Sequence, residues 1–209
     1  MKLVWKALKD FEVSTTPTCG THIHISPLVG SWDVHILAKL AKAIIFFDPA
    51  FETLFPITAA RRQYALGNTH ADAIAQVIAT NNATPYATIF ARIENHLLGA
   101  QGPNLQGFSD YLSPIRRFAW SFNRIGTGGD IEYRWPPGSR NAKDAINHIK
   151  FIRLFVEKVI DADDNDIIKW MGTGRPSVPY LGDFLGRKIS RLFGNRRYWD
   201  EISLRRFWR

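Results

Sequence analysis

Residues 19–26 read Cys-Gly-Thr-His-Ile-His-Ile-Ser, and residues 130–135 read Asp-Ile-Glu-Tyr-Arg-Trp. Both stretches alternate polar with apolar residues, the period of two that is typical of half-buried strands. The residues on the two polar faces are His22, His24 and Ser26 in the first stretch and Asp130, Glu132 and Arg134 in the second. If these faces meet, they form a pocket that contains imidazoles, carboxylates and a guanidinium.

The composition indicates a globular chain. Its 209 residues are 45% hydrophobic, enough for one sizeable core. The single cysteine excludes an internal disulfide framework and suggests a reducing compartment, so we expect a cytoplasmic protein. The sequence has no run of 18 apolar residues, so we expect no membrane span.

The chain is basic, with a formal net charge of +8. Such a charge is compatible with nucleic acid, with an anionic membrane surface or with anionic small ligands. Residues 187–209 contain eight Lys or Arg and only two acidic residues, so much of the charge belongs to the C-terminal end. That end also carries aromatic residues that could stack on bases.

Helical spacing and breaking residues predict the order of elements. We expect a helix that begins at Ser31 as its N-cap and is broken at Asp48-Pro49, and another that begins after Asn141. We expect an acidic loop over 161–166 and a loop over 99–107. The other expected helices span 2–8, 59–64, 72–79, 85–98 and 180–193, and the expected strands span 11–14, 118–122 and 130–135.

The two histidines of the first stretch would lie about 6.6 Å apart on one strand face. They could reach one metal ion, or one could bind metal while the other contacts a nucleotide phosphate; ordinary packing is the alternative. Glu132 could ligate Mg²⁺, and Arg134 could neutralise charge during phosphoryl transfer. A salt bridge of little energetic value is the alternative for that pair.

Three other features carry less information. Arg61 and Arg62 point about 100° apart on a helix, so only one of them need face a pocket. Cys19 has no assigned base and is expected to be a small buried residue. The glycine turn at 126–129 matches neither the Walker nor the dinucleotide pattern.

Taken in order, these signals resemble the amidoligase family of the carboxylate–amine ligase superfamily, relatives of glutamine synthetase and glutamate–cysteine ligase. The matching pieces cover roughly residues 1–160: residues 19–24, Phe55-Pro56 with the two arginines and Tyr64, residues 120–123, and residues 131–136. The resemblance implies an α+β fold with a curved antiparallel sheet flanked by helices, a partial glutamine synthetase-like catalytic domain. The remaining residues, 161–209, would form a basic helical extension.

The resemblance also implies residue roles. His22 and Glu132 would bind Mg²⁺, and Arg134 would bind the phosphates of ATP. His24 would contact the nucleotide, together with Ser26 and Asn123. Arg61 or Arg62 would bind substrate or phosphate. The implied reaction joins a small-molecule or peptide carboxylate to an amine through an acyl phosphate.

The chain departs from the family pattern at its beginning. The family normally begins with strands that carry a Glu-x-Glu motif, whereas Glu12 is the only early glutamate here. We therefore expect a core that lacks its first strands, being a fragment, completed from elsewhere, or catalytically silent. Its sheet would have an unpaired edge that invites a strand from another chain or oligomerisation.

Three hypotheses follow. The first is an ATP- and Mg²⁺-dependent amide ligase. The second is a non-catalytic binding or scaffold protein descended from one. The third, which we rank below these two, is a nucleic-acid binder that uses the C-terminal end.

Overall fold

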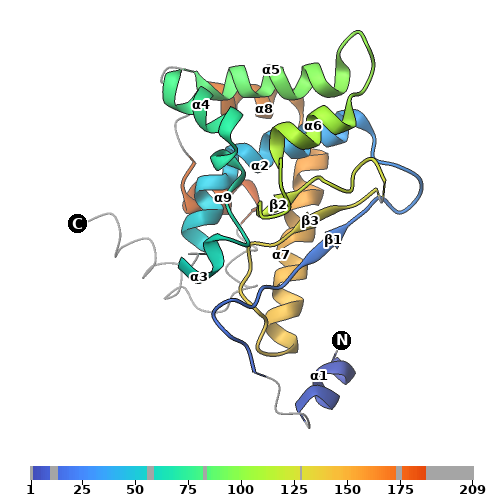
Figure 1. The fold of residues 1–209 in the computed structure, drawn as a ribbon, viewed down its shortest axis with the longest axis vertical. Coiled ribbons are helices and arrows are strands. Elements are labelled where there is room, and N and C mark those ends of the chain that lie inside the picture. The colour runs from blue at the N-terminus through green and yellow to red at the C-terminus, as the bar shows by residue number, and fades with distance from the viewer. Residues whose placement is uncertain are drawn as a thin grey trace, which may run out of the picture.

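The computed structural model describes residues 2–9, 14–55, 59–81, 84–127, 129–172 and 176–186, and these form an α+β fold (Figure 1). The strands are β1 (Ile23–Ile25), β2 (Trp120–Ser121) and β3 (Ile131–Tyr133). The helices are α1 (Lys2–Lys9), α2 (Val34–Leu54), α3 (Ala59–Arg62), the 3₁₀ helix η1 (Asn68–His70), α4 (Asp72–Thr80), α5 (Pro85–Leu98), α6 (Leu105–Leu112), α7 (Ala142–Asp161), α8 (Asp164–Gly172) and α9 (Val178–Phe184).

The sheet is small and antiparallel, with β3 between β1 and β2. The β1–β3 pairing continues beyond the strands, because the amide of Thr21 donates to the carbonyl of Pro136. The expected hairpin of residues 120–135 is confirmed by the pairing of β2 with β3, although β2 is shorter than predicted. A glutamine synthetase-like fold is not established by these three strands.

A side chain closes the outer edge of β2. The Asn68 carboxamide, which is fully buried, accepts a hydrogen bond from Trp120 N and donates to Trp120 O and Leu112 O. It therefore bonds β2 as a neighbouring strand would. Beyond it, Leu66 forms a parallel bridge with Phe118.

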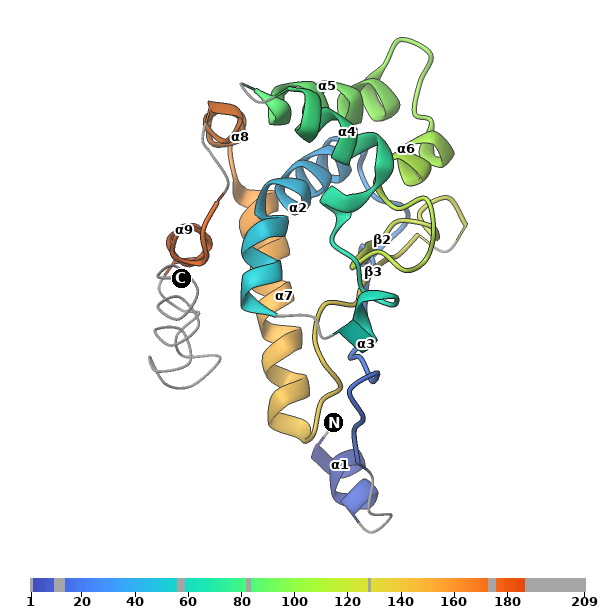
Figure 2. The same cartoon turned by 60° about the vertical axis from the view of Figure 1, so that its left-hand side comes forward.

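Two long helices, α2 and α7, cover the apolar face of the sheet (Figure 2). The ring of Phe51 on α2 lies 6.1 Å from that of Trp120 and 6.3 Å from that of Tyr133. Phe155 on α7 lies 5.8 Å from Trp120. Because these aromatic side chains are buried on the apolar face, the opposite face of β3 remains for the polar residues.

The predicted break at Asp48-Pro49 is wrong, because α2 continues through Pro49 to Leu54. An interior proline costs about 3 kcal/mol. Burial of one Phe side chain contributes about 1.5–3 kcal/mol, and Phe47 and Phe51 on either side of Pro49 are both fully buried. The N-cap is also corrected: Asp33, not Ser31, accepts from the amides of the first turn.

The predicted acidic loop at 161–166 is wrong in its second half, where α8 begins. Asp163 accepts a hydrogen bond from the amide of Asp166, as an N-cap residue does. The predicted loop at 99–107 ends early, since α6 begins at Leu105 with Asn104 as its cap. Short polar residues such as Asp163 and Asn104 are typical of loops, but here they cap helices.

The end of the described chain packs on α2. The ring of Trp170 on α8 stacks on Phe46 at 5.2 Å between centroids, and Leu181 on α9 is fully buried. The division at residue 160 stays a prediction, as does the basic extension, most of which lies outside the described residues. The expected strand at 11–14 and the second half of the expected helix at 180–193 also fall largely outside them.

None of the helices in the described ranges is long and apolar enough to cross a membrane.

Candidate functional site

Glu132 is the centre of a polar cluster on the face of the sheet that α2 and α7 leave uncovered. Its side chain is only 6% exposed. His22 Nδ1 lies 2.9 Å, Arg134 Nε 3.4 Å and His24 Nε2 3.8 Å from the same oxygen, Glu132 Oε1. The two imidazoles remain 39% and 46% exposed, so the cluster is open to solvent on the histidine side.

The strand register produces this cluster. His24 stands directly opposite Glu132 in the β1–β3 pair, and side chains at opposed positions of an antiparallel pair are neighbours. His22 and Arg134 lie two residues from these positions and therefore on the same face. The prediction that the two polar faces meet is confirmed.

Gly20 allows a close approach beside the cluster. A Cβ at this position would lie 2.9 Å from Arg61 Nη2 and 3.3 Å from His22 Nε2. Any larger residue would therefore displace one of these groups. The glycine that precedes the histidines is explained by this contact.

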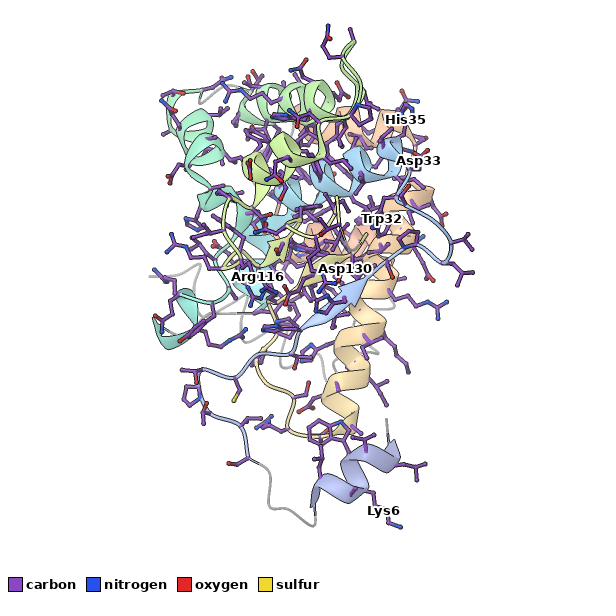
Figure 3. All side chains as sticks on the ribbon, turned by 45° about the vertical axis from the view of Figure 1, so that its right-hand side comes forward. Lys6, Trp32, Asp33, His35, Arg116 and Asp130 are labelled. Atoms are coloured by element: carbon purple, nitrogen blue, oxygen red, sulfur yellow. The ribbon has the colours of Figure 1, made fainter. Side chains whose placement is uncertain are left out.

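Asp130, which directly precedes β3 and is labelled in Figure 3, was not among the predicted site residues although its position two residues before Glu132 puts it on the same face. Its carboxylate lies 2.5 Å from His24 Nδ1 and 2.9 Å from Arg124 Nε. A hydrogen bond at Nδ1 fixes the orientation of the ring and directs Nε2 towards Glu132. The period of two was the signal that could have identified Asp130.

His22 has an altered acidity. Burial lowers the pKa of His22, the charge of Arg134 lowers it further, and Glu132 opposes both. The neutral ring that this favours would donate from Nδ1 to Glu132 and leave Nε2 as an acceptor. A histidine held in this way by a carboxylate presents its second nitrogen to a ligand.

Arg134 and Arg61 differ in their partners. At Nε the two are alike, because both atoms are buried without a hydrogen-bond acceptor within the described ranges, and the Arg134 side chain makes no hydrogen bond there. In contrast, Arg61 donates from Nη1 to the carbonyl of Trp135 at 3.0 Å and from Nη2 to the carbonyl of Arg134 at 2.8 Å. Arg61 therefore holds the end of β3, and its burial lowers its pKa. Arg62, next to it, is exposed.

Ser26 and Asn123, the other predicted nucleotide contacts, are not hydrogen-bonded to the Glu132 cluster among the described residues. Ser26 is exposed just after β1. Asn123 accepts hydrogen bonds from Ser113 and Ser109. Within the part of the chain that the structure describes, no hydrogen bond or ion pair joins Ser26 or Asn123 to the Glu132 cluster, and their roles stay predictions. Cys19 is half-buried rather than buried, and Thr16 bonds to its sulfur.

The donor set decides which ion the cluster could hold. Among the described residues, no group of three or more His, Cys, Asp and Glu side chains could hold a metal ion. Because His22 Nδ1 donates to Glu132 Oε1 at 2.9 Å, His22 Nε2 is the nitrogen that remains for a cation. Mg²⁺ prefers oxygen and usually binds through one or two carboxylates, waters and substrate phosphates. Glu132 would supply one carboxylate to such an ion, and the cluster offers too few donors among the described residues for a complete coordination shell.

Comparison with known proteins identifies the family. Residues 1–156 match the family described as "putative amidoligase enzyme". Searches of curated proteins and of solved structures gave no match. The matched range contains β1, β2, β3 and every residue of the Glu132 cluster. The chain therefore belongs to the amidoligase family.

Proposed function

We propose that the protein joins a carboxylate to an amine with consumption of ATP, in the presence of Mg²⁺, on the open face of the sheet. The observation that carries this proposal is the Glu132 cluster: a buried carboxylate, a partly buried guanidinium and two half-exposed imidazoles on one face. Arg134 Nε lies 3.4 Å from Glu132 Oε1 without a hydrogen bond in the described residues, which leaves this donor for a ligand.

The proposed reaction has two steps. A carboxylate oxygen of the substrate attacks the γ-phosphorus of ATP, the bond to the bridging oxygen breaks, and ADP leaves. The amine then attacks the carbonyl carbon of the acyl phosphate, inorganic phosphate leaves, and the nitrogen loses a proton. The products are an amide, ADP and phosphate.

Each residue of the cluster has a role in this proposal. Arg134 would donate to the transferred phosphoryl group and stabilise the charge that develops on its oxygens. Glu132 and His22 would hold Mg²⁺, which supplies charge neutralisation at the phosphates. His24, oriented by Asp130, would contact the nucleotide through Nε2. Arg61 would keep the carbonyl end of β3 in place, whereas Arg62 has the exposure that a substrate-binding residue needs.

Calorimetric titration with a non-hydrolysable ATP analogue, with and without Mg²⁺, tests the proposal. We expect Mg²⁺-dependent binding that is at least tenfold weaker in Glu132→Gln. The matched control is Glu157→Gln on α7, which neutralises an exposed carboxylate paired with Arg153 and should leave binding unchanged.

The outcomes separate the hypotheses. Binding that is unchanged in Glu132→Gln would reject the site. No binding by a folded wild-type chain would reject ATP chemistry for this chain and favour the non-catalytic binding protein. If the nucleotide binds, carboxylates and amines can be screened by release of phosphate.

A further inference from the structure

A hollow of about 420 Å³ lies where α2, α5 and α8 meet, a size typical of small-molecule sites. Small residues on the facing helices, Ala38 on α2 and Ala87 on α5, leave the space open. Phe90 and Ile167 supply an apolar floor. The hollow can therefore accept an apolar group.

Lys42 is the unusual residue of this hollow. Its side chain is 11% exposed on a helix that is otherwise mostly apolar, and its Nζ lies 2.5 Å from Glu94 Oε1 and 5.8 Å from the centre of the Phe90 ring. An ammonium has three N–H donors. Glu94 is the one hydrogen-bond acceptor that the described residues give it. Because burying such a charge is costly, the remaining donors mark a place for an anionic group.

A second pair repeats the pattern. Lys39 donates to the carbonyl of Ala162 and lies 3.9 Å from Asp164 Oδ1. The hollow is thus bordered by two ammonium groups and two carboxylates, with no net charge apart from His35. The two carboxylates would repel a phosphate or another multiply charged anion. The charge pattern instead complements a ligand that carries one charge of each sign.

We propose that this hollow binds an α-amino acid with an apolar side chain. Its carboxylate would accept from Lys42, its ammonium would donate to Glu94, and its side chain would lie on Phe90 and Ile167. An α-amino acid carries its ammonium and its carboxylate on neighbouring groups. The charges of Lys42 and Glu94 are also adjacent. With the ligand carboxylate beside Lys42 and the ligand ammonium beside Glu94, each charge has opposite charges as neighbours. Ligands with widely separated charges lack this match.

The site is separate from the Glu132 cluster. Lys42 and Phe51 are nine residues apart on α2, which places them on opposite sides of the helix. Phe51 faces the sheet, so the hollow lies on the other side of α2. The proposal therefore does not depend on ATP chemistry at the sheet. Because α2 packs on the opposite, apolar face of the same sheet, the amino acid would act as an effector or stabilising ligand rather than as the reactant at Glu132.

Calorimetric titration of the full chain with L-leucine and L-phenylalanine tests the site. We expect binding of at least one of them, at least tenfold weaker in Lys42→Met and in Glu94→Gln. The exposed Arg153–Glu157 pair on α7 provides matched controls, Arg153→Met and Glu157→Gln, which should bind as the wild type does. Glu132→Gln should also bind normally.

Two further measurements make the test decisive. Ala87→Leu fills the hollow without removing a charge, so it should abolish binding in a chain that still melts cooperatively; retained binding would overturn the proposal. We expect 4-methylpentanoate and 3-methylbutylamine, which each keep one charge of leucine, to bind at least tenfold more weakly. The proposal would be overturned if either compound bound as tightly as leucine. It would also be overturned if neither amino acid bound to the wild type.

Discussion

Two of the buried carboxylates, Glu132 and Asp48, lie in different surroundings. Glu132 lies among imidazoles and a guanidinium on an open sheet face. Asp48 lies inside α2, fully buried, and accepts hydrogen bonds from the amide of Thr69 at 2.8 Å and from its hydroxyl at 2.6 Å. Burial raises the pKa of Asp48 to about 6; the bonds from Thr69 oppose this rise, and the charge of Glu52 adds to it.

The difference separates a binding arrangement from a structural one. Asp48 receives only neutral donors and a like-charged neighbour, so the fold tolerates its charge poorly. Glu132 is provided with positive charge and an exposed approach, which is what a ligand needs. Burial of a carboxylate alone therefore does not identify a site; the charge of its neighbours does.

The largest expected effect concerns Asp48. A carboxyl whose pKa is higher in the folded state holds its proton while the unfolded chain releases it, so stability falls as pH rises from about 4 to 6. A rise from 3.8 to about 6 corresponds to about 3 kcal/mol of unfolding free energy. Urea unfolding from pH 4 to 7.5 should show this fall in the wild type. Asp48→Asn should reduce it below about 1 kcal/mol, and an equal slope in the variant would refute the assignment.

Substitution of Arg61 tests whether this buried guanidinium stabilises the fold. Arg61→Met removes two charge-assisted hydrogen bonds to the end of β3. We expect a loss of about 2 kcal/mol in unfolding free energy, measured in urea, because hydrogen bonds to charged groups contribute about 1.5–3 kcal/mol each and desolvation of the guanidinium offsets part of this. The exposed neighbour provides the control: Arg62→Met should change stability by less than about 0.5 kcal/mol. Similar losses in the two variants would contradict the framework role.

Glu132→Gln makes the same change at the other carboxylate as Asp48→Asn, since each replaces a carboxylate by an amide of the same size. We expect a loss of only about 1 kcal/mol in stability, because the half-exposed histidines can bond to water instead. The nucleotide affinity should fall much more. A stability loss above about 4 kcal/mol, with unfolding at room temperature, would place Glu132 with Asp48 among the structural carboxylates.

The smallest effect concerns Glu52 and His70. Their side chains lie 2.8 Å apart and are 41% and 51% exposed. The hydrogen bond that His70 donates to Glu52 raises the pKa of His70 more than burial lowers it. The stability that this contributes is present below pH 6.5 and lost as pH rises through the folded pKa, and exposure limits it to below about 1 kcal/mol. An NMR titration should show a lower His70 pKa in Glu52→Gln; no change would remove Glu52 as the cause.

The cluster was predictable because it follows from local periodicity. Alternation placed His22 and Glu132 on the polar faces of their strands, but that the two strands pair is shown by the structure. The bond of His24 to Asp130 depends on side-chain rotamers, and the position of Arg61 depends on a helix packing against the end of β3. The helix break predicted at Pro49 was wrong for a related reason. The cost of a proline inside a helix can be read from the sequence, whereas the burial of Phe47 and Phe51 that outweighs this cost cannot. The polar caps at Asn104 and Asp163 have loop-like sequences, so the helices that follow them, α6 and α8, were not predicted.

Asn68 determines at which edge of the sheet a further strand could pair. Its carboxamide occupies the outer side of β2, while in the described part of the chain β1 has no strand on its outer side. A fourth strand, from this chain or from another, would have to join at β1. Its alternate side chains would then stand beside His22 and His24, so an extension of the sheet would also enlarge the polar face.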